Sequence, residues 1–268
     1  MEGTYSPQLD GQETNLAISR LGIKKSNTKI WQLMLLGILA GLYIGFGGQL
    51  FLVTVASGMS KVIGGIMFSV GLILVVIAGA ELFTGNVTIV VGVLSGAVSK
   101  KKMLLNWITV YIGNFIGSIL LAWMIAGSGL FGSLGDPNTL GLLAADVAEA
   151  KLAIPFGQAL IRGIFCNILV ILAIIMSIMA KDIISKVFVI IFPIATFVAC
   201  GFEHSVANMF LIPAGLLAKG LPLHQTWIAF QNIIPVTIGN LIGGILILVI
   251  HPNRIRQIKM LVTWHRGS

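Results

Sequence analysis

The chain has 268 residues, of which 57% are hydrophobic and only 10% are charged, with a mean hydropathy of +1.00 and a formal net charge of +8. A water-soluble domain of this size needs many more charged residues to cover its surface, so the composition predicts one bundle of membrane-spanning helices. The basic residues form short clusters between apolar runs, which argues against a nucleic-acid partner.

The chain order predicts three parts. Residues 1–28 are polar and lack the apolar core of a cleavable signal peptide, so we expect a cytoplasmic N-terminal segment. A transmembrane channel domain is expected over 29–252, and a cytoplasmic C-terminal tail over 253–268. A span needs about 20 mainly apolar residues. Six segments qualify: Ile30–Ala56, Val62–Ile89, Met103–Ala126, Pro155–Ala180, Val187–Leu217 and Thr226–Ile250. The longest connection, Gly127–Ile154, is expected to be a Gly-rich loop.

The distribution of lysine and arginine predicts the orientation. Thirteen of these residues fall on the side of the two termini, and only Lys61, Lys151 and Lys219 fall on the other. Because cytoplasmic loops are enriched in Lys and Arg, we expect a multi-pass protein of the inner or plasma membrane with both termini in the cytoplasm. Arg162 lies within the fourth span, and the sequence leaves its role open.

Two pairs of motifs predict an internal repeat. Val110–Leu120 and Val236–Leu246 share the pattern Gly-Asn-x-Ile-Gly, whose small residues allow two helices to approach closely. Polar clusters at Glu81–Asn86 and Glu203–Asn208 interrupt the second and fifth spans. The separations of 126 and 122 residues are nearly equal. An odd number of spans in each half makes the halves run in opposite directions, which is an inverted repeat typical of channels and transporters.

The two polar clusters predict an anion site. Ionisable side chains and non-helical backbone persist at membrane depth only beside protein partners or a water-filled cavity, and helix N-termini favour anions. Thr84 supplies a hydroxyl, and His204 is the only histidine within a span. The sequence therefore predicts that Thr84 and His204 form a central site for a small monovalent anion. The alternative is that both clusters are kinks held by hydrogen bonds.

Other polar residues of the spans are predicted to support these breaks. Free carboxylates at Glu81 and Glu203 would repel an anion, so we expect them to accept hydrogen bonds from N–H groups of the broken helices. Similar roles are expected of five asparagines: Asn86, Asn114, Asn167, Asn208 and Asn240. Asn167 is expected to hold either His204 or the break in the fifth span.

Four apolar residues and one lysine lie near the predicted pathway. Phe68, Phe197, Leu72 and Leu82 are close to the breaks in sequence, where apolar rings and chains can dehydrate an ion, although each residue could instead face lipid or pack internally. Lys151 precedes the fourth span. It either raises the local anion concentration at a pore mouth or is a solvated loop charge.

Catalytic and cofactor motifs are missing from the sequence. It contains no phosphate-binding loop, no dinucleotide-binding motif in a βαβ setting and no Cys/His spacing typical of a metal site. We therefore expect no enzyme activity, no cofactor and no metal.

Several motifs resemble the formate/nitrite transporter family, which includes formate, nitrite and hydrosulfide channels. The matching stretches are Phe68-Ser-Val-Gly-Leu-Ile-Leu, Gly79-Ala-Glu-Leu-Phe-Thr-Gly-Asn86, Asn106-Trp-x-x-Val-Tyr-x-Gly-Asn114, Phe197-Val-Ala-Cys-Gly-Phe-Glu-His-Ser-Val-Ala-Asn-Met-Phe210 and Ile234-Pro-Val-Thr-Ile-Gly-Asn240. The resemblance implies an all-α, aquaporin-like protomer with six helices, of which the second and fifth are broken, and a homopentamer in the bilayer with one pore per protomer. The Asn-Pro-Ala boxes of aquaporins are absent.

The resemblance also implies roles for single residues. It places Thr84 and His204 at the central site, Phe68 and Phe197 at an outer constriction, Leu72 and Leu82 at an inner one, Lys151 in the vestibule and Asn167 near the histidine. Gly85-Asn86 departs from many formate channels, so the sequence leaves open whether the anion is formate, nitrite or hydrosulfide. A proton-coupled anion symporter and a membrane sensor with a closed pore are the alternative functions.

Overall fold

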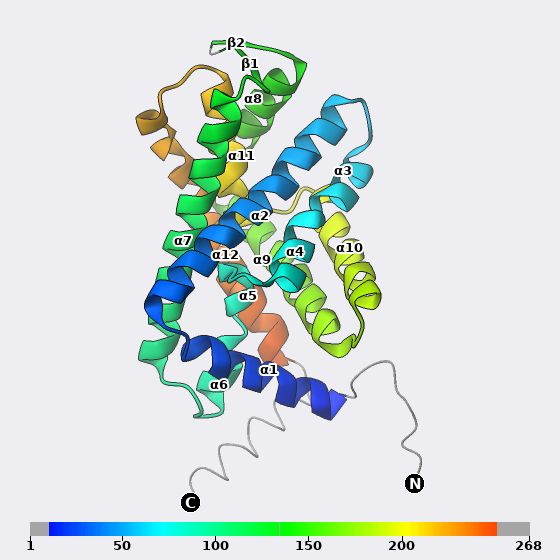
Figure 1. Ribbon diagram of the computed structural model, residues 1–268, viewed down its shortest axis with the longest axis vertical. Coiled ribbons are helices and arrows are strands. Elements are labelled where there is room, and N and C mark those ends of the chain that lie inside the picture. The colour runs from blue at the N-terminus through cyan, green and yellow to red at the C-terminus, as the bar shows by residue number, and fades with distance from the viewer. Residues whose placement is uncertain (1–10, 134, 251–268) are drawn as a thin grey trace, which may run out of the picture.

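The structure is a computed structural model that describes residues 11–133 and 135–250. Almost all of this part of the chain is helical (Figure 1). Helical backbone is expected of a chain rich in apolar runs, because a helix satisfies its own N–H and C=O groups without water. The first half contains α1 (Gly11–Ser26), α2 (Ile30–Ala56), α3 (Lys61–Phe68), α4 (Val70–Leu74), the π-helical turn η1 (Val75–Gly79), α5 (Phe83–Asn86), α6 (Ile89–Leu94) and α7 (Lys100–Gly127).

The second half begins with a short antiparallel pair of strands, which several helices follow. It contains β1 (Gly132–Ser133), β2 (Asp136–Pro137), α8 (Thr139–Leu152), α9 (Phe156–Met179), α10 (Ile183–Ala199), α11 (Ser205–Ala218), the 3₁₀ helix η2 (Leu223–Ala229) and α12 (Phe230–Ile250). Figure 1 shows α1 across one end of the bundle and α8 with the strands at the other. We call these the α1 end and the α8 end.

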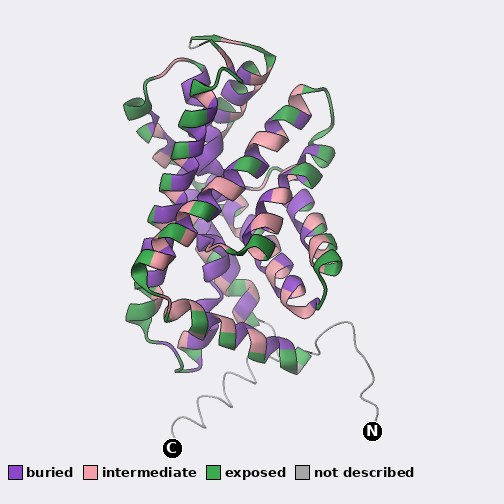
Figure 2. Cartoon of the chain, in the orientation of Figure 1, coloured by how far each residue is buried: buried purple, intermediate pink, exposed green. Residues whose placement is uncertain are grey.

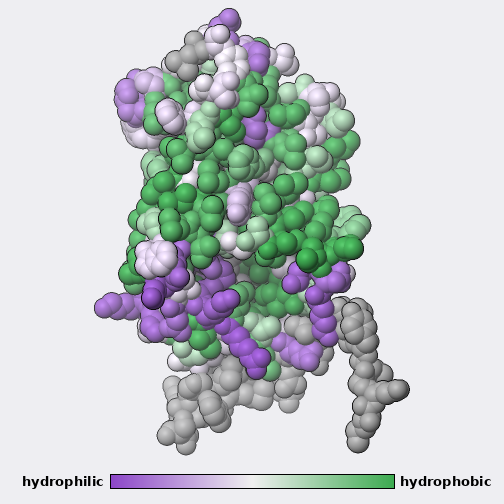
Figure 3. Space-filling view, viewed as in Figure 1, coloured by the Kyte–Doolittle hydropathy of each residue, from purple (hydrophilic) through white to green (hydrophobic). Residues whose placement is uncertain are grey.

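Five apolar helical stretches of the described residues are long enough to cross a membrane: Ile30–Ala56, Lys61–Gly79, Lys100–Gly127, Phe156–Met179 and Leu223–Ile250. Each overlaps one of the six predicted spans. The other predicted span, Val187–Leu217, is divided into the shorter helices α10 and α11. Exposed apolar side chains form a broad belt between the two ends of the molecule (Figure 3). The fold is therefore that of a helical, multi-pass membrane protein.

The connection Gly127–Ile154 is not the loop that its glycines predicted, because it contains the helix α8. Asn138 caps this helix by accepting a hydrogen bond from the Gly141 N–H at 3.0 Å. Ala144, Ala145 and Ala148 are buried, and α8 packs against α11. With only 14 residues, α8 is too short to span the membrane and instead covers one end of the bundle.

The repeated Gly-Asn-x-Ile-Gly segments lie at the two closest helix pairs. A Cβ placed on Gly117 of α7 would overlap the carbonyl oxygen of Ile38 in α2, and one on Gly243 of α12 would overlap that of Ile164 in α9. Small residues at these positions let the backbones pack directly. Figure 2 shows a buried interior along the middle of the bundle, where every residue of α11 is buried.

Replacement of Gly117 by alanine should destabilise the protein by roughly 1–3 kcal/mol, because the added methyl group must push α7 away from α2. Gly127→Ala in the same helix is the matched control, since a Cβ there has nothing within 4 Å. It should be neutral or slightly stabilising. Thermal unfolding of both purified variants in detergent tests this difference, and an equal loss of stability in both would contradict it.

Candidate functional site

The two predicted polar clusters lie where the chain leaves helical geometry. In the first half, η1 ends at Gly79, whose φ of 85° is in the left-handed region, and α5 begins at Phe83. In the second half, α10 ends at Ala199, Gly201 has a φ of 70°, and α11 begins at Ser205. The two glycines are 122 residues apart, and glycine adopts this conformation without strain.

Two asparagines satisfy the backbone at these breaks. Asn114 Oδ1 accepts a hydrogen bond from the Phe83 N–H at 2.9 Å, and its Nδ2 donates to the carbonyl oxygens of Gly37 and Glu81. Asn240 Oδ1 accepts from the Ser205 N–H at 2.9 Å, and its Nδ2 donates to the carbonyl oxygens of Gly163 and Glu203. Each asparagine therefore joins one break to a neighbouring long helix.

The glutamate side chains make different contacts from those we expected. Glu81 Oε2 lies 2.7 Å from Lys25 Nζ, and the two carboxylate oxygens of Glu203 lie 2.9 and 3.0 Å from Lys151 Nζ. The N–H groups that we assigned to these carboxylates bind Asn114 and Asn240 instead. A carboxylate at such depth requires a cation, which explains the difference. Lys151 is likewise not a solvated loop charge, because it lies in α8 and forms this pair.

Each ion pair belongs to a small network of amides. Asn86 Oδ1 accepts from Lys25 Nζ, and its Nδ2 donates to Asn106 Oδ1, while Asn106 Nδ2 donates to the Lys25 carbonyl. In the other half, Asn208, Asn232 and Lys151 form a similar network around Glu203. Asn208 Nδ2 donates to Glu203 Oε2 and Asn232 Oδ1, and Asn232 Nδ2 donates to the Lys151 carbonyl.

Our sequence reasoning missed Lys25, Asn106 and Asn232. The spacing of the repeat could have identified them, because Lys25 and Lys151 are 126 residues apart, as are Asn106 and Asn232. These separations equal that of the repeated Gly-Asn-x-Ile-Gly segments. Lys25 was assigned to a separate N-terminal segment, whereas α1 packs against α6, α7 and α9 and brings this lysine into the bundle.

Thr84 and His204 meet between the two breaks. Thr84 Oγ1 lies 3.0 Å from His204 Nε2, and both residues are buried. His204 Nδ1 accepts a hydrogen bond from the Ala207 N–H at 3.1 Å, so this nitrogen carries no proton. A neutral ring then has its proton on Nε2 and donates to Thr84 Oγ1, which leaves the threonine O–H available to donate elsewhere.

The capping role of the histidine is specific to the second half. His204 occupies the N-cap position of α11, and Leu82, 122 residues earlier, occupies the N-cap position of α5. A leucine side chain has no acceptor for the helix N–H groups. The helices that follow the two breaks therefore differ in the side chain at the N-cap position.

Apolar side chains lie on both sides of this pair. The rings of Phe68 and Phe197 meet edge to face with centroids 5.7 Å apart, and Phe197 stacks on the His204 ring at 5.9 Å. Phe68 and Phe197 line a hollow at the α8 end. Leu72 and Leu82 line a hollow at the α1 end. All four side chains are at most 3% exposed.

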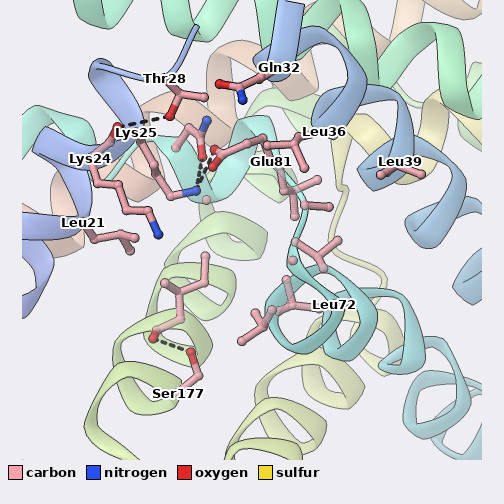
Figure 4. A pocket seen from close by; sticks show the side chains of 18 of the residues that line it. Leu21, Lys24, Lys25, Thr28, Gln32, Leu36, Leu39, Leu72, Glu81 and Ser177 are labelled. Carbon is pink, nitrogen blue, oxygen red and sulfur yellow. Dashed lines mark hydrogen bonds and ion pairs between the residues drawn. The ribbon is translucent and has the colours of Figure 1, made fainter.

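The hollow at the α1 end has a volume of about 870 Å³ (Figure 4). Lys24 and Lys25 project into it from α1, and Glu81 meets Lys25 there, while Leu72 and Ser177 lie on the opposite side. The hollow at the α8 end is smaller, about 350 Å³, and its lining includes Lys151, Glu203 and His204. Each hollow therefore ends near one member of the buried pair.

Asn167 and Arg162 have definite positions in α9. Asn167 Nδ2 donates to the Asn240 carbonyl at 2.6 Å and contacts the Thr84 carbonyl at 3.4 Å, so it holds the threonine side of the site rather than His204. Arg162 is half-buried, lines the hollow at the α8 end, and its carbonyl accepts a hydrogen bond from the Glu203 N–H.

Comparisons with known proteins agree with this architecture. The sequence matches the formate/nitrite transporter family over residues 12–252. A probable formate transporter of Methanothermobacter thermautotrophicus is 38% identical over 256 residues, which cover 87% of this chain and 91% of the relative. The formate channel FocA of Escherichia coli K12 is 36% identical over 246 residues, which cover 83% of this chain and 86% of that protein.

Solved structures give the same result. A pentameric formate channel with formate bound is 37% identical, with a TM-score of 0.72, and the match covers 88% of this chain and 98% of that one. An ion channel of the same family is 29% identical with a TM-score of 0.78, over 88% of this chain and 95% of that one. These proteins are channels and transporters rather than enzymes. The chain described here is a member of the formate/nitrite transporter family.

Proposed function

We propose that this protein is a channel for a small monovalent weak-acid anion, with formate as the leading candidate. The observation that carries the proposal is the contact between Thr84 Oγ1 and His204 Nε2, because Gly85, next to Thr84, lines the hollow at the α1 end and His204 lines the hollow at the α8 end. Relatives with formate in their names support the choice of anion.

The proposed architecture is a homopentamer of six-crossing protomers, each with its own pore. Each protomer consists of two inverted halves within residues 29–252, and both termini lie in the cytoplasm. The repeated contacts of Asn114 and Asn240, each to a break and to a glycine of a neighbouring long helix, support the two-half plan. The pentameric state of a related formate channel supports the assembly.

The pathway that we propose begins in either hollow. The anion loses water beside Phe68 and Phe197 or beside Leu72 and Leu82, where low polarity makes a bare charge costly. At the centre it accepts a hydrogen bond from the free Thr84 O–H and, when Thr84 moves, from His204 Nε2–H. These two donors replace part of the lost hydration.

Proton movement in this scheme is limited by the cap of α11. Protonation of His204 at Nδ1 would break its bond to the Ala207 N–H, so the ring favours the neutral state and donates a hydrogen bond only. A proton that accompanies the anion therefore comes from water in the hollows. Passage as the neutral acid would avoid a desolvation cost of several kcal/mol for the ion.

Replacement of His204 by asparagine should lower anion flux about ten- to a hundred-fold, because it removes a hydrogen bond to a charged group, which contributes roughly 1.5–3 kcal/mol. Asparagine is a good N-cap residue, so α11 should still form. Formate-driven flux into liposomes is the measurement. His224→Asn, at an exposed position in η2, is the control. Normal flux and selectivity in both His204→Asn and Thr84→Ala would refute the central site.

Replacement of Lys151 by methionine should destabilise the protein and reduce flux, because it leaves Glu203 charged and buried. Loss of one partner of a buried pair costs roughly 3–5 kcal/mol. Lys219→Met should cost at most about 1 kcal/mol, since Lys219 pairs with Glu149 at an exposed position. The double variant Lys151→Met/Glu203→Gln should recover part of both losses. Thermal unfolding and liposome flux are the measurements, and a double variant no better than Lys151→Met would contradict this electrostatic account.

The wild-type channel should pass formate at least as fast as nitrite and hydrosulfide when the three gradients are equal. Stopped-flow light scattering of proteoliposomes measures each anion, and an internal pH dye measures protons in the same vesicles. A channel gives a proton-to-anion ratio that varies with pH, since the anion and its neutral acid change in proportion. A fixed ratio at all pH values would identify a symporter, and no flux of any anion would favour a closed sensor.

A further inference from the structure

We infer that the α1 end of the bundle binds one anionic membrane lipid, with its headgroup on Lys100 and Lys101 and one hydrocarbon chain in an apolar crevice between α7 and α12. The crevice opens on the outside of the bundle and is lined by none of the residues assigned to the pathway, although its lining includes Phe83, the chain neighbour of Thr84. The inference is therefore independent of which anion the protein passes.

The crevice has a volume of about 340 Å³, within the range of about 300–1,000 Å³ that is typical of small-molecule sites. Its walls are mainly apolar side chains of the two helices: Leu104, Trp107 and Ile108 of α7, and Ile234, Ile238 and Leu241 of α12. Ile108 is 57% exposed and Ile238 is 40% exposed, so the crevice opens on the hydrophobic belt of the molecule. Its surface fits a hydrocarbon chain.

The lysines and the crevice lie on one face of α7. Residues three and four positions apart are neighbours on a helix surface, so Lys100 and Lys101 lie directly before Leu104, which in turn precedes Ile108. All four side chains are exposed. A molecule lying along this face meets two positive charges at the end of the helix and apolar surface beyond them, which matches the two parts of an anionic lipid.

The positive charges have no counterpart within the described part of the chain. Lys102 donates a hydrogen bond to Asn27, whereas the side chains of Lys100 and Lys101 take part in none of the ion pairs or hydrogen bonds of residues 11–133 and 135–250. Cations at a helix N-terminus are disfavoured by the helix dipole. An external anion beside these lysines would offset that repulsion.

A lipid fits these observations better than the other two occupants. A soluble phosphate would use the lysines but not the apolar crevice. A second copy of the chain could cover the crevice with apolar surface, but it would supply little negative charge to the two lysines, because lysine and arginine outnumber acidic residues at its own α1 end. Anionic headgroups attract such basic residues at the edge of a membrane.

Native mass spectrometry of the full-length protein in detergent, with equal amounts of phosphatidylglycerol and phosphatidylcholine of the same chain length, tests the inference. The protein should retain phosphatidylglycerol preferentially, and Lys100→Gln/Lys101→Gln should reduce that preference roughly ten-fold or more. Arg20→Gln/Lys24→Gln removes two charges from α1 at the same end and should leave the preference unchanged. Ile108→Trp, at an exposed position, should fill the crevice and reduce retention of both lipids.

Several outcomes would overturn the inference. Equal retention of the two lipids by the wild type would do so, as would an unchanged preference in Lys100→Gln/Lys101→Gln. Displacement of phosphatidylglycerol by the same concentration of inorganic phosphate would show that the lysines bind a phosphate without using the crevice. A change in subunit number in Ile108→Trp, with lipid retention unchanged, would assign the crevice to a second copy of the chain.

Discussion

The structure depends on one constraint, which is that backbone N–H and C=O groups at membrane depth require partners. Inside two of the predicted spans the chain leaves helical geometry, between Gly79 and Phe83 and between Ala199 and Ser205, and these breaks expose such groups in the interior. Asn114 and Asn240 supply the partners, and each also binds a carbonyl group of an adjacent long helix. One amide side chain thus binds both the backbone at a break and the backbone of a long helix. This fixes the position of each break relative to the long helices, which pack against one another through the repeated glycines.

The fixed position of the breaks also determines how the side chains of His204 and Thr84 are oriented. His204 stands at the start of α11, where its Nδ1 caps the helix and its Nε2 points to Thr84. The cap selects the tautomer, and the tautomer makes Thr84 the acceptor in that contact. An ordinary helix-capping bond thus determines which groups remain free to donate at the centre of the proposed pathway. Leu82 cannot reproduce this arrangement at the start of α5, because a leucine side chain accepts no hydrogen bond.

The sequence was sufficient to predict the apolar helices and the family, and it singled out Thr84 and His204, whose side chains lie 3.0 Å apart. Spacing alone identified Glu81 and Glu203 as related, because a repeat preserves the positions of residues that satisfy the same backbone. It did not predict their side-chain partners, since Lys25 and Lys151 lie far away in the chain and are brought close only by the packing of α1 and α8. For the same reason α8 was mistaken for a loop. The helix α8 is too short for a span, and it is buried only because α11 packs against it. The order of residues along the chain does not reveal that contact.

The pairing of Lys151 with Glu203 also changes the electrostatic interpretation of the hollows. A lysine whose charge is balanced at 2.9 Å attracts a distant anion much less than a free lysine does. The same holds for Lys25 and Glu81 at the other end. In the proposed pathway, long-range attraction must therefore come from other cations. Those that line the hollows outside these ion pairs are Lys24 and Lys186 at the α1 end and Lys61 and Arg162 at the α8 end. The two buried pairs instead hold the breaks in place, and they keep each glutamate from repelling the anion that passes it.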